Sequence, residues 1–390
     1  MRSAPSRRKI SAKLNLELSE ALGFCWPPER TGPGRVSPTS FVREGASGYC
    51  EFAMPPSVTT AIFGAGAWGT ALAVMLARAG ERATLCVRRA DQFNAFRRVH
   101  QNSTYLPGIE LPETLGLVTD WRAAAPADVL VIAIPSAHVR AALTPIADAI
   151  RPDAIIVSAT KGIDHARLQT MTQMLAELVP RQVRLAALSG PGFAAEVARG
   201  KPAALVAAAQ DEAVARRVQE LFAARTLRVY SSTDVLGVEI CGAVKNVVAI
   251  AAGVSDGLEL GSSARAAVIT RGLAEIMRLV DAAGGRRETA AGLAGLGDLV
   301  LTCTGDLSRN RAIGLALARR EPVPIDAENS ATTGRAVAEG VANSRSVLAL
   351  ARKLGVEMPI VSAVYRGLYE GQAPNAMVEA LLTRGLKAEF

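Results

Sequence analysis

The sequence predicts a doubly wound α/β domain followed by an all-α domain. From residue 58 to about 231, short β-branched runs alternate with helical stretches, and the runs lack the polar alternation of a sheet with one wet face. From about residue 234, Ala-rich segments recur at helical period without a convincing strand. A chain of 390 residues also exceeds what one hydrophobic core usually organises, so we expect two domains.

The expected elements of the first domain follow one another in βα order. The strands are expected at residues 59–63, 83–87, 128–134, 154–158, 184–188, 203–208 and 227–230. Helical stretches between them include 70–79, 138–149, 166–178 and 211–223. A Ser/Thr/Asp segment at 231–234 offers a helix cap, so we divide the chain into domains at 54–233 and 234–390. Gly-rich breaks in the second domain are expected near 253–262, 284–285 and 292–297.

Residues 1–53 differ from the rest, because they are rich in proline and have no sustained periodicity. Three interpretations are open: a targeting peptide, a disordered tail, or an upstream stretch outside the natural product. Met54 stands immediately before the first expected strand, which favours the last of these. We therefore expect residues 1–53 to be a disordered or non-native extension.

Composition restricts the class of partner. The formal charge is +8, but residues 1–53 carry 8 Lys and Arg against 5 Glu, and no basic run elsewhere is longer than a pair. Aromatic residues make up only 4%, too few for a base-stacking platform. These observations argue against nucleic acid and favour anionic small molecules as ligands.

Cysteine and histidine usage argues against disulfides and metal sites. The five cysteines, at positions 25, 50, 86, 241 and 303, are scattered and form no CxxC pair. The three histidines, at 100, 138 and 165, make no ligand-spaced cluster with them. We expect no metal, and a reducing compartment such as the cytoplasm.

One stretch without charged residues, 52–77, is long enough to suggest a membrane span. Two prolines at 55 and 56 and three glycines at 64, 66 and 69 would break such a helix. A turn, a buried strand, a Gly-rich loop and a helix describe the stretch better. We therefore expect a soluble protein without stable membrane insertion.

The pattern Gly64-x-Gly66-x-x-Gly69 follows an expected strand and opens an expected helix. The first glycine permits a tight turn, the second lets the backbone approach a pyrophosphate, and the third packs helix on strand. This context favours a Rossmann dinucleotide-binding domain; an ordinary Gly-rich βα turn is the alternative.

The second strand, 83–87, ends in Arg88 and Arg89 rather than in an acidic residue. An acid there would bind the ribose 2′-OH of NAD, whereas arginine suits the 2′-phosphate of NADP. We expect NADP as cofactor without excluding NAD. The alternative is a solvated arginine pair.

A nicotinamide enzyme that interconverts an alcohol and a ketone needs a proton donor near the hydride path. His138 and His165 are expected to be polar surface groups. Lys245 lies in an apolar helical segment, and its neighbours at i±3 and i±4 include no acid. Burial would lower its pKa and suit it to acid/base catalysis, unless the side chain snorkels to water.

Further polar groups follow expected strands or helix starts. Lys161-Gly162 and Ser189-Gly190-Pro191-Gly192 lie where doubly wound sheets bind ligands, although both are also ordinary turn sequences. Ser308-Arg309-Asn310 has the composition of a phosphate clamp. It is equally open that Ser308 is only the N-cap of a helix and that Asp298 is only a turn residue.

These motifs in their order resemble bacterial NAD(P)-dependent glycerol-3-phosphate dehydrogenase, from about Val58 to the C-terminus. The similar runs are Gly64-Ala-Gly-Ala-Trp68-Gly69, Thr160-Lys161-Gly162, Ser189-Gly190-Pro191, Glu239-Ile-Cys-Gly-Ala-Val-Lys245-Asn246, Gly295-Leu-Gly-Asp298 and Ser308-Arg309-Asn310. The resemblance implies reversible reduction of dihydroxyacetone phosphate to sn-glycerol 3-phosphate for phospholipid synthesis. A homodimer is the assembly that we keep open.

By position, the resemblance implies that Lys245 is the proton acceptor in glycerol 3-phosphate oxidation, with Lys161 and Asp298 in the catalytic group. It implies substrate binding by Lys161, Gly190, Gly192, Lys245, Asp298, Ser308, Arg309 and Asn310. It implies cofactor contacts at Gly64, Gly66, Ala67, Trp68, Gly69, Arg88, Arg89, Lys161, Ala194, Arg309, Val337 and Glu339.

One residue and one segment depart from the family pattern. Gly192 stands where relatives often have Ser or Thr, and the segment 102–107, Asn-Ser-Thr-Tyr-Leu-Pro, is an imperfect version of Asn-Pro-x-Tyr-Leu-Pro.

Two alternative functions stay open. One is a β-hydroxyacid-type dehydrogenase with a carboxylate substrate, and the other is a non-enzymatic NADP-binding redox sensor.

Overall fold

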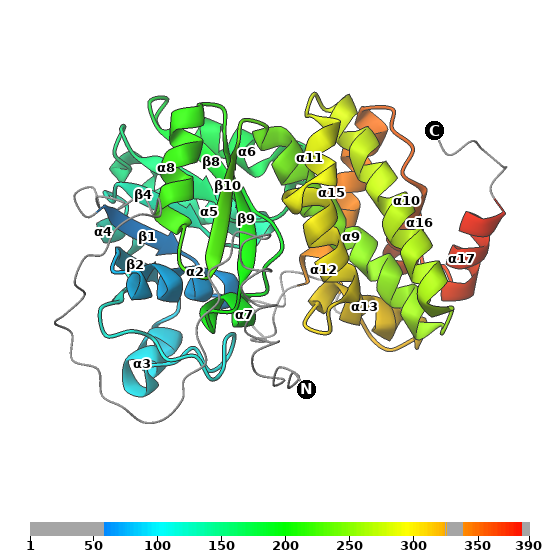
Figure 1. Cartoon of the computed structure of the whole chain (residues 1–390), viewed down its shortest axis with the longest axis horizontal. Coiled ribbons are helices and arrows are strands. Elements are labelled where there is room, and N and C mark those ends of the chain that lie inside the picture. The colour runs from blue at the N-terminus through cyan, green and yellow to red at the C-terminus, as the bar shows by residue number, and fades with distance from the viewer. Residues whose placement is uncertain (1–57, 324, 326–337, 384–390) are drawn as a thin grey trace, which may run out of the picture. The chain divides into compact units, whose positions relative to one another are not determined.

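The computed structural model describes residues 58–323, 325 and 338–383. Its main feature is an eight-stranded sheet in the order β10-β9-β8-β5-β4-β1-β2-β3 (Figure 1). The strands are β1 (Thr59–Phe63), β2 (Arg82–Cys86), β3 (Gly116–Val118), β4 (Val129–Ile132), β5 (Ile155–Ser158), β8 (Arg184–Ser189), β9 (Ala203–Ala209) and β10 (Leu227–Ser232). The strand order reverses beside β1, which pairs with both β2 and β4, so the crevice that binds ligands in such sheets opens there.

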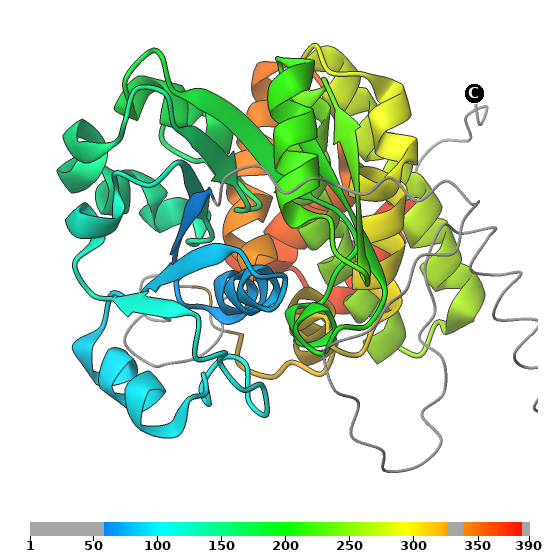
Figure 2. The same ribbon diagram turned by 60° about the vertical axis from the view of Figure 1, so that its left-hand side comes forward.

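Helices cover both faces of this sheet (Figure 2). Alternate residues of β1 point to opposite faces: Phe63 packs in a cluster with Leu143 and Leu175 from the helices of one face, and Ile62 is buried from the other. The helices of this domain are α2 (Ala67–Arg78), α3 (Ala90–Val99), α4 (Trp121–Ala124), α5 (Ser136–Leu143), α6 (Met171–Leu178), α7 (Ala194–Ala198) and α8 (Glu212–Phe222). The doubly wound prediction is thereby confirmed.

A doubly wound domain is expected to have a parallel sheet, and that expectation is wrong at one pair of strands. β9 runs antiparallel to β8, with Ala187 opposite Ala208, and β10 then runs parallel to β9. The connection from β8 to β9 contains only the five-residue helix α7, which returns the chain at the same edge of the sheet instead of crossing it. Strand direction is not encoded in an apolar run, so the pattern could not reveal this.

Two expected helices are shorter than the sequence pattern indicated. Residues 138–149 form α5 and then a 3-10 turn at Thr144–Ala149, because Pro145 has no N–H to continue the α-helix. Residues 166–170 belong to a hairpin of β6 (Ile163–Asp164) and β7 (Gln169–Thr170), and α6 starts only at Met171, where Thr170 closes a capping box. Helix α3 and strand β3 were not expected.

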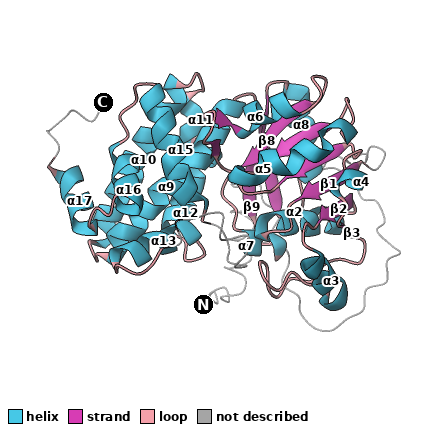
Figure 3. Ribbon diagram, turned by 180° about the vertical axis from the view of Figure 1, so that it is seen from behind, coloured by secondary structure: helices cyan, strands magenta, loops and turns pink. Residues whose placement is uncertain are grey.

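The second domain is helical in the residues described, as expected (Figure 3). Its central helix α9 (Val235–Gly257) is buried along most of its length and begins at the Asp234 cap, whose Oδ1 accepts a 2.9 Å hydrogen bond from the N–H of Gly237. Around it lie α10 (Gly261–Ala282), α11 (Arg287–Ala291), a π-helical turn at Leu293–Gly297, α12 (Asp298–Thr304), α13 (Arg309–Ala318), α15 (Glu339–Lys353), α16 (Pro359–Tyr369) and α17 (Pro374–Leu382).

The break expected near 253–262 is confirmed, because α9 ends at Gly257 and α10 begins at Gly261, but Gly253 itself lies inside α9. A Cβ on Gly253 would lie 2.1 Å from the carbonyl oxygen of Arg311, and one on Gly314 would lie 2.0 Å from that of Ile250. These two glycines let α9 and α13 approach closely. Glycine there serves helix packing rather than termination.

Helix α9 is also long and apolar enough to span a membrane by length and composition, but 83% of its apolar window is buried inside the fold. That burial is typical of the core helix of a globular domain.

Candidate active site

The Gly-rich loop after β1 has the geometry that a dinucleotide site requires. Gly64 has a φ of +116°, and a Cβ there would lie 2.4 Å from the carbonyl oxygen of Ala133 after β4. A Cβ on Gly69 would lie 2.0 Å from the carbonyl oxygen of Gly64, so the third glycine packs α2 against the loop. A Cβ on Gly66 would meet no atom within 4 Å. The second glycine thus faces open space at the N-terminus of α2, where a pyrophosphate can approach.

A cavity of about 210 Å³ lies in front of this loop. It is lined by Gly64, Gly66, Ala67, Trp68, Arg88, Arg89, Arg309 and Glu339, which the sequence singled out. It is also lined by residues that the sequence analysis missed or set aside: Ala65, Gln92, Tyr105, Trp121, Ala133, Ile134, Pro135, His138, Ala142, Ala159 and Thr160. His138 is therefore a cavity residue rather than the surface group we expected. Ala194 opens α7, outside this lining, and Val337 lies outside the described residues.

The segment that departs from the family pattern supports the loop. The buried side chain of Asn102 donates hydrogen bonds to the carbonyl oxygen of Ala65, at 3.1 Å, and to Oγ1 of Thr70, at 2.7 Å. Gln92 donates a second hydrogen bond to the Ala65 carbonyl, at 2.9 Å. Both amides therefore fix the backbone of the Gly-rich turn.

The two arginines after β2 are not equivalent. The guanidinium of Arg89 forms a bidentate ion pair with Asp91, through Nε at 3.0 Å and Nη2 at 2.5 Å. Arg88 is exposed and has no such partner among the described residues. Of the two arginines after β2, Arg88 is thus the one without an ion pair among the described residues. The sequence analysis missed Asp91, which lies five residues after the end of β2. Its carboxylate reaches Arg89 because α3 starts between them, at Ala90.

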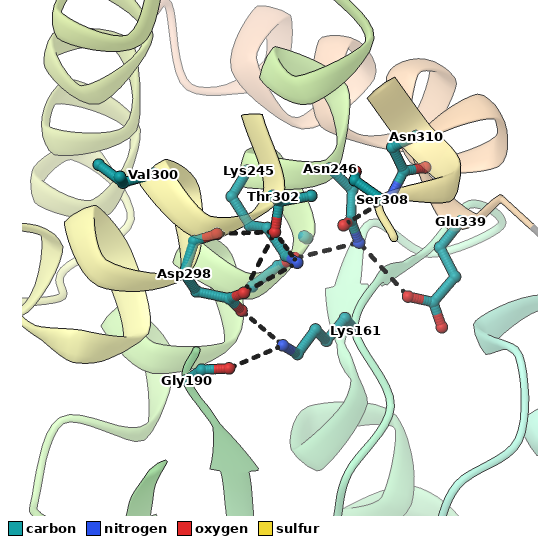
Figure 4. A network of polar contacts seen from close by, with 12 residues as sticks. Lys161, Gly190, Lys245, Asn246, Asp298, Val300, Thr302, Ser308, Asn310 and Glu339 are labelled. Carbon is teal, nitrogen blue, oxygen red and sulfur yellow. Dashed lines mark hydrogen bonds and ion pairs between the residues drawn. The ribbon is translucent and has the colours of Figure 1, made fainter. Parts of the chain in front are cut away.

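Two lysines from different domains converge on Asp298 (Figure 4). Nζ of Lys161, from the loop after β5, lies 2.5 Å from Oδ2 of Asp298, and Nζ of Lys245, from the middle of α9, lies 3.0 Å from Oδ1. Lys245 and Asp298 are 6% and 2% exposed. The prediction that only a distant group satisfies Lys245 is confirmed, and Asp298 is not a turn residue but the first residue of α12.

Thr302 completes the surroundings of Lys245, and the sequence analysis missed it. Its Oγ1 accepts a 2.7 Å hydrogen bond from Nζ of Lys245 and lies 2.7 Å from the carbonyl oxygen of Asp298, one turn earlier in α12. Asp298 and Thr302 are four residues apart and share a helix face, a spacing that could have revealed the pair. An ammonium has three N–H donors, so one remains for a substrate.

Lys161 reaches a second acceptor in the loop after β8. Its Nζ lies 3.3 Å from the carbonyl oxygen of Gly190, whose φ is +135°. Gly192 lies beside this turn, where a Cβ would meet Val197 and Trp68 at ordinary contact distance. The loop after β8 thus brings Gly190 to Lys161, whereas Gly192 lies against Trp68 and Val197.

The Ser308-Arg309-Asn310 segment opens α13. Ser308 is buried and its Oγ accepts the N–H of Arg311, so the N-cap interpretation is confirmed. Asn310 is buried and donates a 2.8 Å hydrogen bond to Oδ1 of Asn246, whose own amide donates to Glu339 at 3.3 Å. Arg309 is exposed and lines the cavity, with its charge toward Glu339.

Burial and the lysine pair set the proton affinities of the cluster. The pKa of Lys245 is lowered to about 8, mainly by burial and also by the nearby charge of Lys161, while Asp298 opposes both. Burial alone would raise the pKa of Asp298, but the two ammonium groups hold it below its usual value. Burial raises the pKa of Glu339, against the influence of Arg309. Lys245 is therefore poised near neutral pH, as burial in an apolar segment predicted.

Possible metal ligands and a second cavity were compared with this cluster. No group of three or more His, Cys, Asp or Glu side chains able to hold a metal ion occurs in the described part of the chain. A larger cavity, of about 650 Å³, lies between α6, α8 and the start of α9, and none of the charged groups above lines it. The lysine pair does not line the smaller cavity itself, but Thr160, next to Lys161, and Glu339, whose charge interacts with both lysines, do.

Comparisons with known proteins agree with this geometry. Residues 59–215 match the model of the NAD-dependent glycerol-3-phosphate dehydrogenase N-terminus, and residues 234–379 match that of its C-terminus. A glycerol-3-phosphate dehydrogenase [NAD(P)+] of Geobacter sulfurreducens is 48% identical over 331 residues, which cover 84% of this chain and 98% of that protein.

Solved structures of the same kind superpose on the chain. The glycerol-3-phosphate dehydrogenase of Coxiella burnetii is 42% identical, with a TM-score of 0.78, covering 84% of this chain and 99% of that one. That of Saccharomyces cerevisiae is 25% identical, with a TM-score of 0.69, covering 84% and 99%. The fold and the site define a nicotinamide-dinucleotide-dependent dehydrogenase. Within that class, the chain belongs to the NAD-dependent glycerol-3-phosphate dehydrogenase family.

Proposed function

We propose that the protein reduces dihydroxyacetone phosphate to sn-glycerol 3-phosphate with NADPH or NADH, in a reversible hydride transfer. The observation that carries the proposal is the convergence of Lys161 and Lys245 on Asp298, next to the dinucleotide cavity. Two ammonium groups around one buried carboxylate leave a positive site that favours an anionic substrate. The relatives of Geobacter sulfurreducens and Coxiella burnetii, both named glycerol-3-phosphate dehydrogenase, support the same substrate.

The cavity fits the cofactor on two observations. The Cα of Gly66 borders open space at the start of α2, and Arg88 stands free where a ribose 2′-phosphate would lie. Gly64, Gly69, Ala67 and Trp68 would form the pyrophosphate side, with Arg89, Ala194, Val337 and Glu339 as further contacts. The nicotinamide, when bound, supplies the hydride. Everything else in the reaction falls to the protein's own side chains.

Lys245 supplies the proton. When hydride reaches C2 of the substrate, the ketone oxygen gains negative charge and takes a proton from the third N–H of Lys245. The neutral amine then regains a proton from water. A pKa of about 8 suits both steps, because the group is mostly protonated at neutral pH yet gives its proton readily. In the oxidation of glycerol 3-phosphate the same amine accepts the proton.

Asp298 and Lys161 orient these partners. Asp298 holds Lys245 through one carboxylate oxygen and Lys161 through the other, so both ammonium groups have fixed directions. Lys161, Arg309 and Asn310 bind the phosphate end and orient C2. Ser308, Gly190 and Gly192 shape the walls of the substrate site, the glycines through their backbone.

The cellular setting follows from this reaction. Glycerol 3-phosphate supplies the backbone of phospholipids, so we assign the protein to lipid synthesis in the cytoplasm. A homodimer is compatible with the assignment, and neither nucleic acid nor stable membrane insertion is part of it.

The test is oxidation of NADPH, followed by its absorbance, on addition of dihydroxyacetone phosphate. We expect turnover with this substrate, little with unphosphorylated dihydroxyacetone, and none with a 2-oxo acid. Turnover of the 2-oxo acid instead would indicate a β-hydroxyacid-type dehydrogenase. Cofactor binding without turnover of any of the three would contradict an enzyme and favour a redox sensor. Arg309→Ala should raise the KM for dihydroxyacetone phosphate and leave the weak turnover of unphosphorylated dihydroxyacetone unchanged.

A further inference from the structure

Asn343 joins the backbones that carry the two lysines. It lies in α15, beside α9, and is 1% exposed. Its Nδ2 donates to the carbonyl oxygen of Lys161, at 3.2 Å, and to that of Ala243, at 3.3 Å. Ala243 is two residues before Lys245 in α9. One buried amide thus bridges the loop of the first lysine and the helix of the second.

The loop is packed tightly against this amide. A Cβ on Gly162, the residue after Lys161, would lie 3.0 Å from Oδ1 of Asn343 and 2.5 Å from Oγ of Ser136. The absence of a side chain at Gly162 therefore allows the contact. An amide held on both sides by backbone leaves its neighbours little freedom to shift relative to each other.

We propose that Asn343 is a positioning residue that sets the separation of Lys161 and Lys245 on the two oxygens of Asp298. The inference rests on the proposed function, since it assigns Asn343 a part in the same reaction. Asn343 touches neither lysine's ammonium group, so it acts on them through their backbones. Loss of the amide should let the Lys161 loop move away from α9 while the fold of each domain persists.

The electrostatics of the cluster give the inference a distinctive signature. The groups that face Lys245 are Asp298, Thr302 and Cys303 from α12, Lys161 from the β5 loop and Glu339 from α15, with Cys241 one turn earlier in α9. Among these, Lys161 carries the like charge that lowers the pKa of Lys245. If Lys161 moves away, the pKa of Lys245 rises. Reduction of the substrate requires protonated Lys245. The pH above which kcat for reduction falls should therefore move upward.

The experiment compares Asn343→Ala with Ser344→Ala. Ser344 is the next residue, is equally buried, and its Oγ donates only to the Val341 carbonyl of its own helix. We expect Asn343→Ala to lower kcat for dihydroxyacetone phosphate roughly ten- to a hundredfold at neutral pH, the cost of misplacing reacting groups. NADPH affinity should be unchanged, and the alkaline limit of kcat should move upward. Ser344→Ala should match the wild type in all three.

The inference is overturned if Asn343→Ala matches Ser344→Ala, or if its activity falls only in proportion to the folded fraction with an unmoved pH profile. If Asn343→Ala does not fold, Asn343→Ser, which keeps a donor, should show the same changes in smaller measure. A wild-type protein that does not turn over dihydroxyacetone phosphate contradicts the proposed function instead. The pKa of Lys245, followed by NMR of ¹³C-labelled lysine and assigned with Lys245→Met, then decides the inference alone: an unchanged pKa in Asn343→Ala overturns it.

Discussion

Lys245 donates a 3.0 Å hydrogen bond to Oδ1 of Asp298, which lies 53 residues further along the chain. None of the neighbours of Lys245 one turn away in α9 is acidic, so this distant carboxylate is what makes a buried ammonium tolerable. The same carboxylate binds Lys161 through its other oxygen. Helix α12 thus carries a carboxylate that aligns a lysine of the sheet domain with a lysine of the helical domain.

Two substitutions in the Gly-rich loop should separate cofactor binding from stability. Gly66→Ala adds a Cβ that meets no protein atom, at a residue in ordinary extended conformation, so the melting temperature should not fall. NADPH binding should weaken about tenfold or more, because the Cβ occupies the space that the pyrophosphate needs. Gly69→Ala should instead destabilise the fold by about 1–3 kcal/mol, since its Cβ meets the Gly64 carbonyl at 2.0 Å. Equal loss of stability in both variants would contradict this division.

Cofactor choice is predicted to depend on Arg88 more than on Arg89. Arg89 is occupied by Asp91, whereas Arg88 is free, so Arg88→Ala should weaken NADPH binding roughly ten- to a hundredfold, the equivalent of a charge-assisted contact. NADH binding should change little. Titration of both cofactors against Arg88→Ala and Arg89→Ala checks this. If Arg88→Ala weakens both cofactors equally, it does not bind the 2′-phosphate.

Glu239 is predicted to make stability depend on pH. Its buried carboxylate accepts the N–H of Thr172 at 2.9 Å and its hydroxyl at 2.5 Å, and burial raises its pKa above the ordinary 4.5. A raised folded pKa means that the favourable contribution is complete below 4.5 and is lost as pH rises through the folded pKa. Glu239→Gln, which cannot ionise, should therefore gain melting temperature relative to the wild type as pH rises above 4.5. The opposite trend would mean that the threonine contacts outweigh burial.

The extension before the sheet domain is predicted to be dispensable. A chain that begins at Met54 should keep the kcat, the KM and the melting temperature of the full chain, because the family match starts at residue 59. Parallel assays of the two chains decide it. A clear loss of activity or stability on truncation would assign residues 1–53 a part in the fold or the site.

Local features were predictable from the sequence, and features set by tertiary contact were not. Gly64, Gly66 and Gly69 act within one strand–loop–helix unit, so their roles could be assigned from spacing alone. The lack of a local partner for Lys245 was equally visible. That its partner is shared with Lys161 was not, since it depends on how α12 packs on α9. Asn343 had no signal at all, because an amide that bonds backbone carbonyls carries no motif.

Glycine in helices shows the same limit. Gly253 was counted in the break expected near 253–262, yet it lies inside α9, where its missing side chain leaves room for the Arg311 carbonyl of α13. The direction of β9 likewise depends on a short connection rather than on its own residues. Patterns report what a segment can form, whereas the neighbours decide what it does form.

The central claim is that Lys245 is the general acid/base, and turnover of Lys245→Met tests it most directly. Methionine keeps an unbranched side chain of similar length and removes the proton. Proton transfer by a positioned side chain contributes about 10²–10⁴ in rate, so kcat for dihydroxyacetone phosphate should fall by that range while NADPH affinity stays near normal. A raised KM with kcat largely intact would contradict the claim and leave Lys245 a substrate ligand only.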